Sequence, residues 1–389
     1  MPTRAAFAFV FVTVMLDMLA LGIMVPVLPK LIVAFEGGDV ARAARVSGLF
    51  GFIWAAMQFV VSPALGALSD RFGRRPVILL SNFGMALDYV LMAWAPTLGW
   101  LFLGRILSGV TAATVSTAGA YIADVTPVER RARSYGILGA AFGLGFVIGP
   151  AVGGLLGAID LRLPFWVCAG LSLLNFLYGL FVLPESLPPE RRAVGAWANP
   201  LSGLKVLTGS REVRWLAGAA FLFYLAHEAL PAVFVLYTDH AFHWDAGQVG
   251  LALGAVGVCS MLVSAVLVGR LVARLGERWT MRIGIVSVGL GFLLQAVAPA
   301  QGVFVAAIPF VALGGLTSPA LQAVLSKRVD ASAQGRLQGA ISSLRGVAGM
   351  IGPLLFTQVF SGALDVFPGA PWLVGALLFG LALAATLGG

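Results

Sequence analysis

Five ionisable residues lie inside long apolar runs of the sequence, where charges are rare. Three are acids, Asp17, Asp88 and Glu228, and two are bases, Arg105 and Arg345. A charge at the centre of a bilayer costs about 2.5–3.5 kcal/mol even on lenient scales, so such residues usually have a function. A carboxyl group removed from water favours its neutral form, whereas a nearby cation favours the ionised form. These acids therefore predict proton handling in competition with ligand binding, with fixed structural ion pairs as the alternative.

Asp17 and Glu228 are the strongest candidates for proton-coupling residues. Asp17 lies about 10 residues into its apolar run, which places it about 15 Å deep at a rise of 1.5 Å per residue. Glu228 lies about 15 residues into a later run, and Asp88 about 12 residues into its own. For Asp88, a proton-coupling role and a purely structural role remain equal alternatives.

Transmembrane helices are the elements that must position these residues. The chain of 389 residues is 59% hydrophobic and 11% charged, whereas soluble domains carry about 25% charged residues. A membrane span needs about 20 apolar residues, and twelve segments meet this length. They are 7–34, 47–68, 76–95, 98–122, 134–158, 163–183, 213–238, 247–271, 279–298, 301–325, 335–360 and 370–388. We therefore predict an all-α integral membrane protein with 12 transmembrane helices.

The distribution of Lys and Arg predicts the orientation of these helices. With the N-terminus inside, 19 of the 25 Lys and Arg residues lie in cytoplasmic loops, four lie on the other side and two lie within spans. Short cytoplasmic loops carry an excess of Lys and Arg in membrane proteins. We therefore expect both termini and the central loop in the cytoplasm. The net charge of +8 then reflects topology, and we expect no binding of nucleic acid.

The sequence also repeats internally. Gly66, Arg71, Gly73 and Arg75 recur 203 residues later as Gly269, Arg274, Gly276 and Arg278, and a second block from Arg133 to Pro150 recurs with the same shift. A duplication of six helices is typical of transporters whose substrate site lies between the halves. We therefore predict an N-terminal six-helix bundle at 1–183, a cytoplasmic linker at 184–212 and a C-terminal six-helix bundle at 213–389.

Several stretches resemble a known family. GALSDRFGRRP at 66–76 resembles the loop signature of the major facilitator superfamily, and GLGFVIGPAVGG at 143–154 resembles the fifth-helix motif of its proton-coupled drug antiporters. Shorter stretches that resemble the tetracycline efflux pumps begin at Ile23, Leu87, Tyr121, Leu183, Pro319 and Ile351. The resemblance implies that a proton enters while a drug leaves, across the inner membrane of a bacterial cell.

The loop motif is expected to take part in gating. Asp70 lies among three arginines at a helix junction, and the resemblance implies a charge latch between the halves. The copy in the second half has Ala273 where Asp70 stands, so such a latch has one acid. The alternative is that the arginines only set the topology. The candidate gating residues here and in the fourth span are Gly66, Asp70, Arg71, Gly73, Arg74, Arg75 and Arg105.

The fifth predicted span is rich in glycine. Gly143, Gly149 and Gly153 belong to a series with spacings of mostly four residues, which predicts one shared face. Small residues allow a neighbouring helix to approach closely, and Pro150 cannot donate a helix hydrogen bond and favours a kink. We expect a hinge and seal at this helix, and plain close packing is the alternative.

The second half departs from the tetracycline efflux pumps. Those pumps have an intramembrane Asp and a His at positions where this chain has Val288 and Ser260. Tetracycline therefore does not follow as the substrate, and we expect a lipophilic drug-like compound, tetracycline-like or not. The candidate substrate-binding residues are Gln58, Trp54, Phe223, His227 and Arg345.

Arg345 needs a partner, because an unpaired arginine within a span is too costly. In the superfamily, the seventh and eleventh helices line the same side of the cavity. We therefore predict a Glu228–Arg345 ion pair that opens when Glu228 is protonated.

Other classes of function lack the residues that they need. An enzyme needs a nucleophile, metal or cofactor constellation, and the sequence has no phosphate-binding loop and no clustered metal ligands. We expect no enzyme activity, no metal and no cofactor, with the proton gradient as the energy source. We also expect a monomer in the lipid bilayer. The alternative function is proton-coupled import of a small metabolite, which the glycine-rich helix disfavours.

Overall fold

The computed structural model describes residues 2–111, 114–192, 202–330 and 333–388, and within these ranges it contains helices and no strands. Ten helices in this part of the chain are long and apolar enough to cross a membrane. One of them, Ala246–Ala296, covers two predicted spans. The predicted span 98–122 is divided between Leu98–Thr111 and Thr114–Val125, on either side of residues that the structure does not describe. The predicted spans thus fall on helices, and the chain is a multi-pass membrane protein.

The helices form two compact units. Unit 1 contains Met1–Phe35, Ile53–Asn199 and Asp245–Gly254, and unit 2 contains Glu36–Phe52, Pro200–Trp244 and Ala255–Gly389. The units follow the two halves of the sequence except at 36–52 and 245–254, each of which belongs to the opposite unit. The predicted domain boundaries stay a prediction, and 193–201 of the predicted linker lie outside the described residues.

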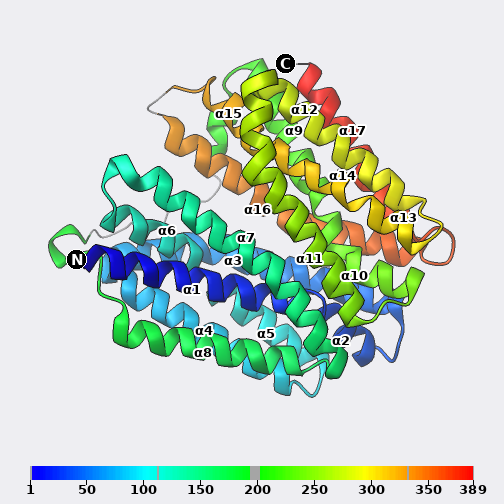
Figure 1. Ribbon diagram of the computed structural model, residues 1–389, viewed down its shortest axis with the longest axis horizontal. Helices are drawn as coiled ribbons and strands as arrows, with labels where there is room; N and C mark the ends of the chain where they lie inside the picture. Colours follow the sequence, from blue (N-terminus) through cyan, green and yellow to red (C-terminus); the bar gives the residue numbers. More distant parts are fainter. Residues whose placement is uncertain (1, 112–113, 193–201, 331–332, 389) are drawn as a thin grey trace. The chain divides into compact units, whose positions relative to one another are not determined.

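Unit 1 is built around its first helix. α1 packs against α7 and α8, and α4 packs against α8 and α5, as the neighbouring ribbons of Figure 1 show. The helices that begin in the first half of the chain are α1 (Pro2–Met24), α2 (Leu28–Phe35), α3 (Val40–Phe72), α4 (Arg74–Trp94), α5 (Leu98–Thr111), α6 (Thr114–Val125), α7 (Val128–Ile159) and α8 (Leu163–Val182). Of these, α2 lies in unit 1, and α3 begins in unit 2 and ends in unit 1.

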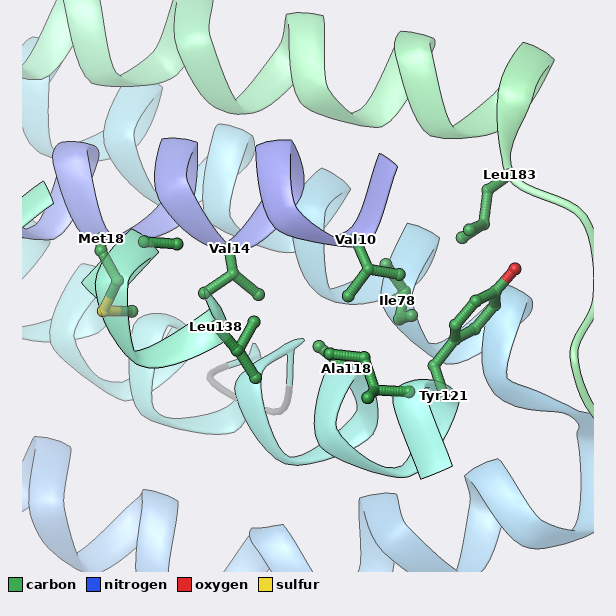
Figure 2. Close-up of a cluster of buried hydrophobic side chains, with 10 residues drawn as sticks. Val10, Val14, Met18, Ile78, Ala118, Tyr121, Leu138 and Leu183 are labelled. Atoms are coloured by element: carbon green, nitrogen blue, oxygen red, sulfur yellow. The ribbon is translucent and has the colours of Figure 1, made fainter. Parts of the chain in front are cut away.

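One face of α1 forms part of the core of unit 1. Val10, Val14 and Met18 recur every fourth residue and therefore point the same way along the helix. Figure 2 shows them facing side chains of α6 and α7, including Tyr121 and Leu138. The hydroxyl of Tyr121 donates a hydrogen bond of 3.0 Å to the carbonyl oxygen of Pro184, so the polar end of this buried ring is satisfied.

Unit 2 contains most of the second half of the chain. Its helices pack as pairs, with α12 against α17 and α9 against both α16 and α17. Aromatic rings fill part of its core, where the rings of Tyr237, Phe304 and Trp372 lie 5.3–5.8 Å apart. The helices of the second half are α9 (Arg211–His227), α10 (Ala229–Phe242), α11 (Ala246–Leu262), α12 (Val268–Ala296), α13 (Gln301–Ala306), α14 (Ile308–Leu313), α15 (Thr317–Ser326), α16 (Gln334–Ala363) and α17 (Ala370–Leu387). Short helical turns at Pro189–Arg191, Ser202–Thr208, Val263–Leu267 and Gly314–Leu316 complete the described elements.

Both halves interrupt their first predicted span at equivalent points. α1 ends at Met24, so that Val25 begins the turn before α2, and Glu228 separates α9 from α10. These two positions differ by 203 residues, which is the shift of the internal repeat. Pro231 follows His227 by four residues and cannot donate to its carbonyl group, which accounts for the break at Glu228. The candidate proton carrier of the second half therefore lies at a helix discontinuity.

The repeated loop motif has the same backbone conformation in both halves. Gly73 has φ of 107° and the equivalent Gly276 has φ of 78°. Side chains with a Cβ rarely adopt positive φ values, which explains glycine at both positions. The structure thus supports the repeat that the sequence indicates.

The glycines of α7 explain its close contact with α1. A Cβ at Gly153 would overlap the carbonyl oxygen of Ile23, and a Cβ at Gly149 would lie 2.7 Å from Cα of Gly22. Gly143, in contrast, faces open space, so it does not share the face predicted for it. The reason is its spacing, since Gly145, Gly149 and Gly153 are four residues apart and Gly143 is not in that register. α7 also continues through Pro150 as one helix.

We expect Gly153→Ala to destabilise the protein, because the new methyl group has to push α1 away from α7. Overpacking of this kind typically costs about 1–3 kcal/mol. Gly143→Ala is the matched control on the same helix and should leave the free energy of unfolding unchanged within about 0.5 kcal/mol. Thermal unfolding of both variants in detergent measures the difference. Equal stability of the two variants would show that α1 and α7 do not approach as closely as described.

Candidate functional site

The loop after α3 places a buried arginine between two acids of unit 1. Arg74 Nη1 lies 2.5 Å from Oδ1 of Asp70, and its Nε lies 3.0 Å from Oδ2 of Asp124. Nη1 also donates to Oγ of Ser69 at 3.1 Å. We call Arg74, Asp70 and Asp124 the Arg74 cluster. It joins the end of α3, the start of α4 and the end of α6.

Glu185 holds the start of α4 in place. Its carboxylate accepts hydrogen bonds of 2.9 Å from the backbone N–H groups of Arg74 and Ser186. A carboxylate at a helix N-terminus is favoured, because it pairs with unsatisfied N–H groups and with the positive end of the helix dipole. Neither Asp124 nor Glu185 was predicted to have a role. Asp124 ends one of the stretches that resemble the tetracycline efflux pumps, and Glu185 lies within another.

The other arginines of the loop motif have separate contacts. The guanidinium of Arg71 lies 5.2 Å from the ring centroid of Phe72, and Nη2 of Arg75 donates to the carbonyl oxygen of Leu180 at 2.8 Å. A Cβ at Gly66 would meet nothing within contact distance. The contacts of Asp70 described here lie within unit 1, so its role as a latch between halves stays a prediction.

Asp17 is buried on α1 and contacts an amide that sequence analysis missed. Nδ2 of Asn175, on α8, donates to Oδ1 of Asp17 at 3.1 Å and to the carbonyl oxygen of Thr13 at 3.2 Å. The exposed fraction is 2% for Asp17 and 0% for Asn175. An asparagine inside an apolar span was the available signal, because buried amides need partners. Asn175 fixes the carboxylate without bringing a charge to it.

We expect Asn175→Leu to lower the free energy of unfolding by about 1.5–3 kcal/mol, the typical contribution of a hydrogen bond to a charged group. In the Asp17→Asn background, Asn175→Leu should lower the free energy of unfolding by less, because the charged acceptor is gone. Thermal unfolding of the four proteins forms a double-mutant cycle. Purely additive losses would mean that Asn175 acts on stability independently of Asp17.

Asp88 and Arg105 lie near each other in the core of unit 1. Asp88 on α4 is 0% exposed and Arg105 on α5 is 6% exposed. They attract each other electrostatically, and no direct ion pair joins these two described residues. The guanidinium of Arg105 lies 5.3 Å from the ring centroid of Trp54 and its Nη1 lies 3.6 Å from Sδ of Met24. This burial fits both the proton-coupling role and the structural role of Asp88, so the choice between them stays open.

Two predicted substrate-binding residues of α3 differ in their availability. One ring of Trp54 already stacks with Arg105, so that face is occupied by a cation of the protein. Gln58 lies one helical turn further along and is partly buried. Among the described residues its side chain has no hydrogen-bond partner, which leaves its amide available to a ligand.

Arg345 lies on α16 in unit 2, and its guanidinium contacts two hydroxyl groups. Nη2 lies 3.3 Å from Oγ of Ser318 and 3.5 Å from the hydroxyl oxygen of Tyr224. The guanidinium also lies 4.7 Å from the ring centroid of Tyr224, and the two hydroxyl oxygens are 3.4 Å apart. We call Arg345, Tyr224 and Ser318 the Arg345 cluster. Tyr224 and Ser318 were not predicted as site residues, because they lie in apolar runs and carry no charge.

The predicted Glu228–Arg345 ion pair is not formed in this structure. The two side chains attract each other, but the guanidinium lies beside the hydroxyl groups of the Arg345 cluster, and the side chain of Glu228 packs closely against Gly352 of α16. A Cβ at Gly352 would overlap this side chain. The two opposite charges therefore lie near each other and remain separate.

Phe223 and His227 lie one helical turn apart on α9. Their rings stack with centroids 6.1 Å apart and an interplanar angle of 14°. Phe223 is buried and also contacts Phe379 at 5.6 Å, so core packing explains this ring. The ring of His227 is exposed, which leaves one flat face near the Arg345 cluster.

Comparison with known proteins identifies close full-length relatives. A model described as Major Facilitator Superfamily matches residues 10–240 and 216–388. The tetracycline resistance protein of class C from Escherichia coli is 39% identical over 99% of this chain and 97% of that protein. The class H protein from Pasteurella multocida is 36% identical over 95% and 92%. A crystal structure of the nucleoside transporter NupG matches with a TM-score of 0.78 and 14% identity over 98% of this chain and 97% of that chain.

Proposed function

Because the chain belongs to the major facilitator superfamily, we propose that it is a proton-coupled antiporter that exports lipophilic drug-like compounds by alternating access. One observation carries this proposal. Relatives named tetracycline resistance proteins are 34–39% identical to the chain and are covered over at least 92% of their length. Tetracycline is therefore the first substrate to test. The chain is a transporter and not an enzyme.

The proton gradient is the proposed energy source, with no cofactor. Asp17, Glu228 and Asp88 are the proposed proton-coupling residues, since a carboxyl group in an apolar environment exchanges readily between charged and neutral forms. Glu228 is supported by its place at a helix break, where the side chain is free of a direct ion pair among the described residues. Gln58, His227 and Arg345 are supported as substrate contacts because each presents a polar group that is at least partly accessible.

The proposed location is the inner membrane of a bacterial cell, with both termini in the cytoplasm and the protein acting as a monomer. The excess of Lys and Arg in one set of loops supports this orientation. It also accounts for the positive net charge without a nucleic acid partner. The Arg74 cluster lies in one of these basic loops, where gating is proposed.

Expression in a bacterial host without its own drug pumps tests the function. We expect reduced accumulation of tetracycline or of another compound in a panel of lipophilic drugs, and we expect an ionophore that collapses the proton gradient to restore accumulation. Accumulation that rises with expression, and falls when the gradient collapses, would instead support the alternative, import of a small metabolite with protons. If the protein is inserted in the membrane and accumulation of every compound in the panel is unchanged, drug export is contradicted.

A further inference from the structure

We propose that the Arg345 cluster and Glu228 form a receptor for a flat ligand that carries two opposite charges. Arg345, Tyr224 and Ser318 take its anionic group, and Glu228 takes its cationic group. This inference rests on the proposed function and names the substrate class of that transporter.

Within the part of the chain that the structure describes, no acid forms a direct ion pair with Arg345. It is the twelfth residue of α16 (Gln334–Ala363), about 16 Å from the start of a membrane-spanning helix at 1.5 Å per residue. A guanidinium at such a depth has to be compensated, yet its partners in the described part of the chain are two neutral hydroxyl groups. A charge that the protein leaves uncompensated is a site for an anion from a ligand.

The geometry of the Arg345 cluster suits a carboxylate or an enolate. The contacts of 3.3 and 3.5 Å are longer than the typical 2.9–3.0 Å for N–H···O bonds, so the donors of Arg345 are only weakly engaged. The hydroxyl groups of Tyr224 and Ser318 can both turn their hydrogens to an anion. Arg345 is exposed and Ser318 is partly exposed, so a ligand can reach them. A planar guanidinium with free N–H groups matches the two oxygens of a carboxylate.

Glu228 supplies the opposite charge at a separate point. Its side chain packs against Gly352 and feels the charge of Arg345 without a direct ion pair. Two opposite charges that are kept apart within the same unit match an ammonium and a carboxylate that are likewise separated. The cationic group and a proton would compete for Glu228, which is the requirement for exchange.

The body of the ligand is expected to be flat and apolar. The exposed ring of His227 stacks on Phe223 with one face, which leaves its other face to a ligand. Aromatic faces of this kind favour stacked rings. A singly charged cation lacks the group that compensates Arg345, so it should bind less tightly than a ligand with both charges.

Binding of a matched series of fluorescent probes tests this inference. The first probe is 4-(anthracen-9-ylmethylamino)butanoate, whose ammonium and carboxylate are separated by three carbons. Its methyl ester keeps only the positive charge, and its N-acetyl derivative keeps only the negative charge. Fluorescence titration of purified protein in nanodiscs at about pH 8, where free carboxyl groups are ionised, should show that the first probe binds at least about tenfold more tightly than the other two.

Variants assign each charge to its residue. Arg345→Gln should weaken binding of the doubly charged probe at least about tenfold and leave binding of the ester unchanged. Glu228→Gln should weaken binding of the doubly charged probe by a similar factor and leave binding of the N-acetyl derivative unchanged. Tyr224→Phe should weaken binding of only the two probes that carry a carboxylate. This variant tests the anion site even if Arg345→Gln does not fold. Arg270→Gln is the control, because exposed Arg270 contacts only the carbonyl of Val266 among described residues.

Two outcomes would overturn the inference. One is equal or tighter binding of the ester by the unmodified protein, and the other is an equal loss for all three probes in Arg345→Gln or Tyr224→Phe. Neither outcome bears on export, since binding needs no gradient. A protein that exports tetracycline without this charge preference contradicts the inference alone, and a protein that shows the preference without export contradicts the proposed function alone.

Discussion

Glu228→Gln is expected to reduce proton-driven transport to the level of liposomes without protein, while the variant still inserts and folds. The amide has nearly the shape of the carboxyl group and keeps its contact with Gly352, but it cannot bind and release a proton. Glu228 is the only acid within the interior of a span among the described residues of unit 2, so no neighbour replaces it. Substrate uptake into proteoliposomes under an imposed pH gradient measures this loss.

A second acid of the same unit provides the control for Glu228. Glu277 lies in the loop within α12 and pairs with Lys327 at 2.6 Å, outside the predicted spans. Glu277→Gln also removes one negative charge. It should leave the transport rate within about twofold of the unmodified protein, because exposed ion pairs contribute only about 0–1 kcal/mol to stability. Full pH-driven transport by Glu228→Gln would show that Glu228 is structural and that proton coupling lies in unit 1.

Arg74→Gln is expected to destabilise the protein by about 3 kcal/mol, because it leaves the carboxylates of the Arg74 cluster without their cation. The two contacts do not contribute equally. The side chain of Asp70 is 47% exposed, and an exposed i,i+4 pair is worth about 0.3–0.5 kcal/mol. The side chain of Asp124 is 22% exposed and that of Arg74 is 11% exposed, so most of the loss should come from Asp124.

Arg71→Gln is the matched control for Arg74→Gln. Arg71 belongs to the same motif, is exposed and stacks on Phe72, so its replacement should change the free energy of unfolding by less than about 0.5 kcal/mol. Thermal unfolding of the two variants in detergent compares them directly. If both variants lose the same stability, the arginines of this loop act as a general positive charge and not through the contacts of Arg74.

The apolar spans and the internal repeat could be predicted from sequence because they depend on composition and spacing. Equal spacing paired Gly73 with Gly276, and the structure gives both a positive φ. Gly143 was assigned to the wrong face because the series was read as one stripe. Gly143 is two residues from Gly145 and six from Gly149, and neither spacing places it on the face that those glycines share.

The contacts of the candidate site could not be predicted in the same way. Asn175 meets Asp17 across 158 residues of sequence, and spacing along one helix does not specify which neighbour a side chain faces. The Glu228–Arg345 pair was predicted from the two charges and from the helices on which the family resemblance places them. The neutral hydroxyl groups of Tyr224 and Ser318, which lie beside the guanidinium instead, give no signal in a search for intramembrane charges.

Exchange of protons for a drug is the central claim, and one measurement tests it directly. Purified protein is reconstituted into liposomes that contain a pH indicator, and tetracycline is added on the outside with the lumen more acidic. Antiport predicts tetracycline uptake together with an accelerated rise of the luminal pH, and loss of both effects with an ionophore that collapses the gradient. Tetracycline uptake that is unaffected by the gradient, or that carries protons in the same direction as the drug, would contradict antiport.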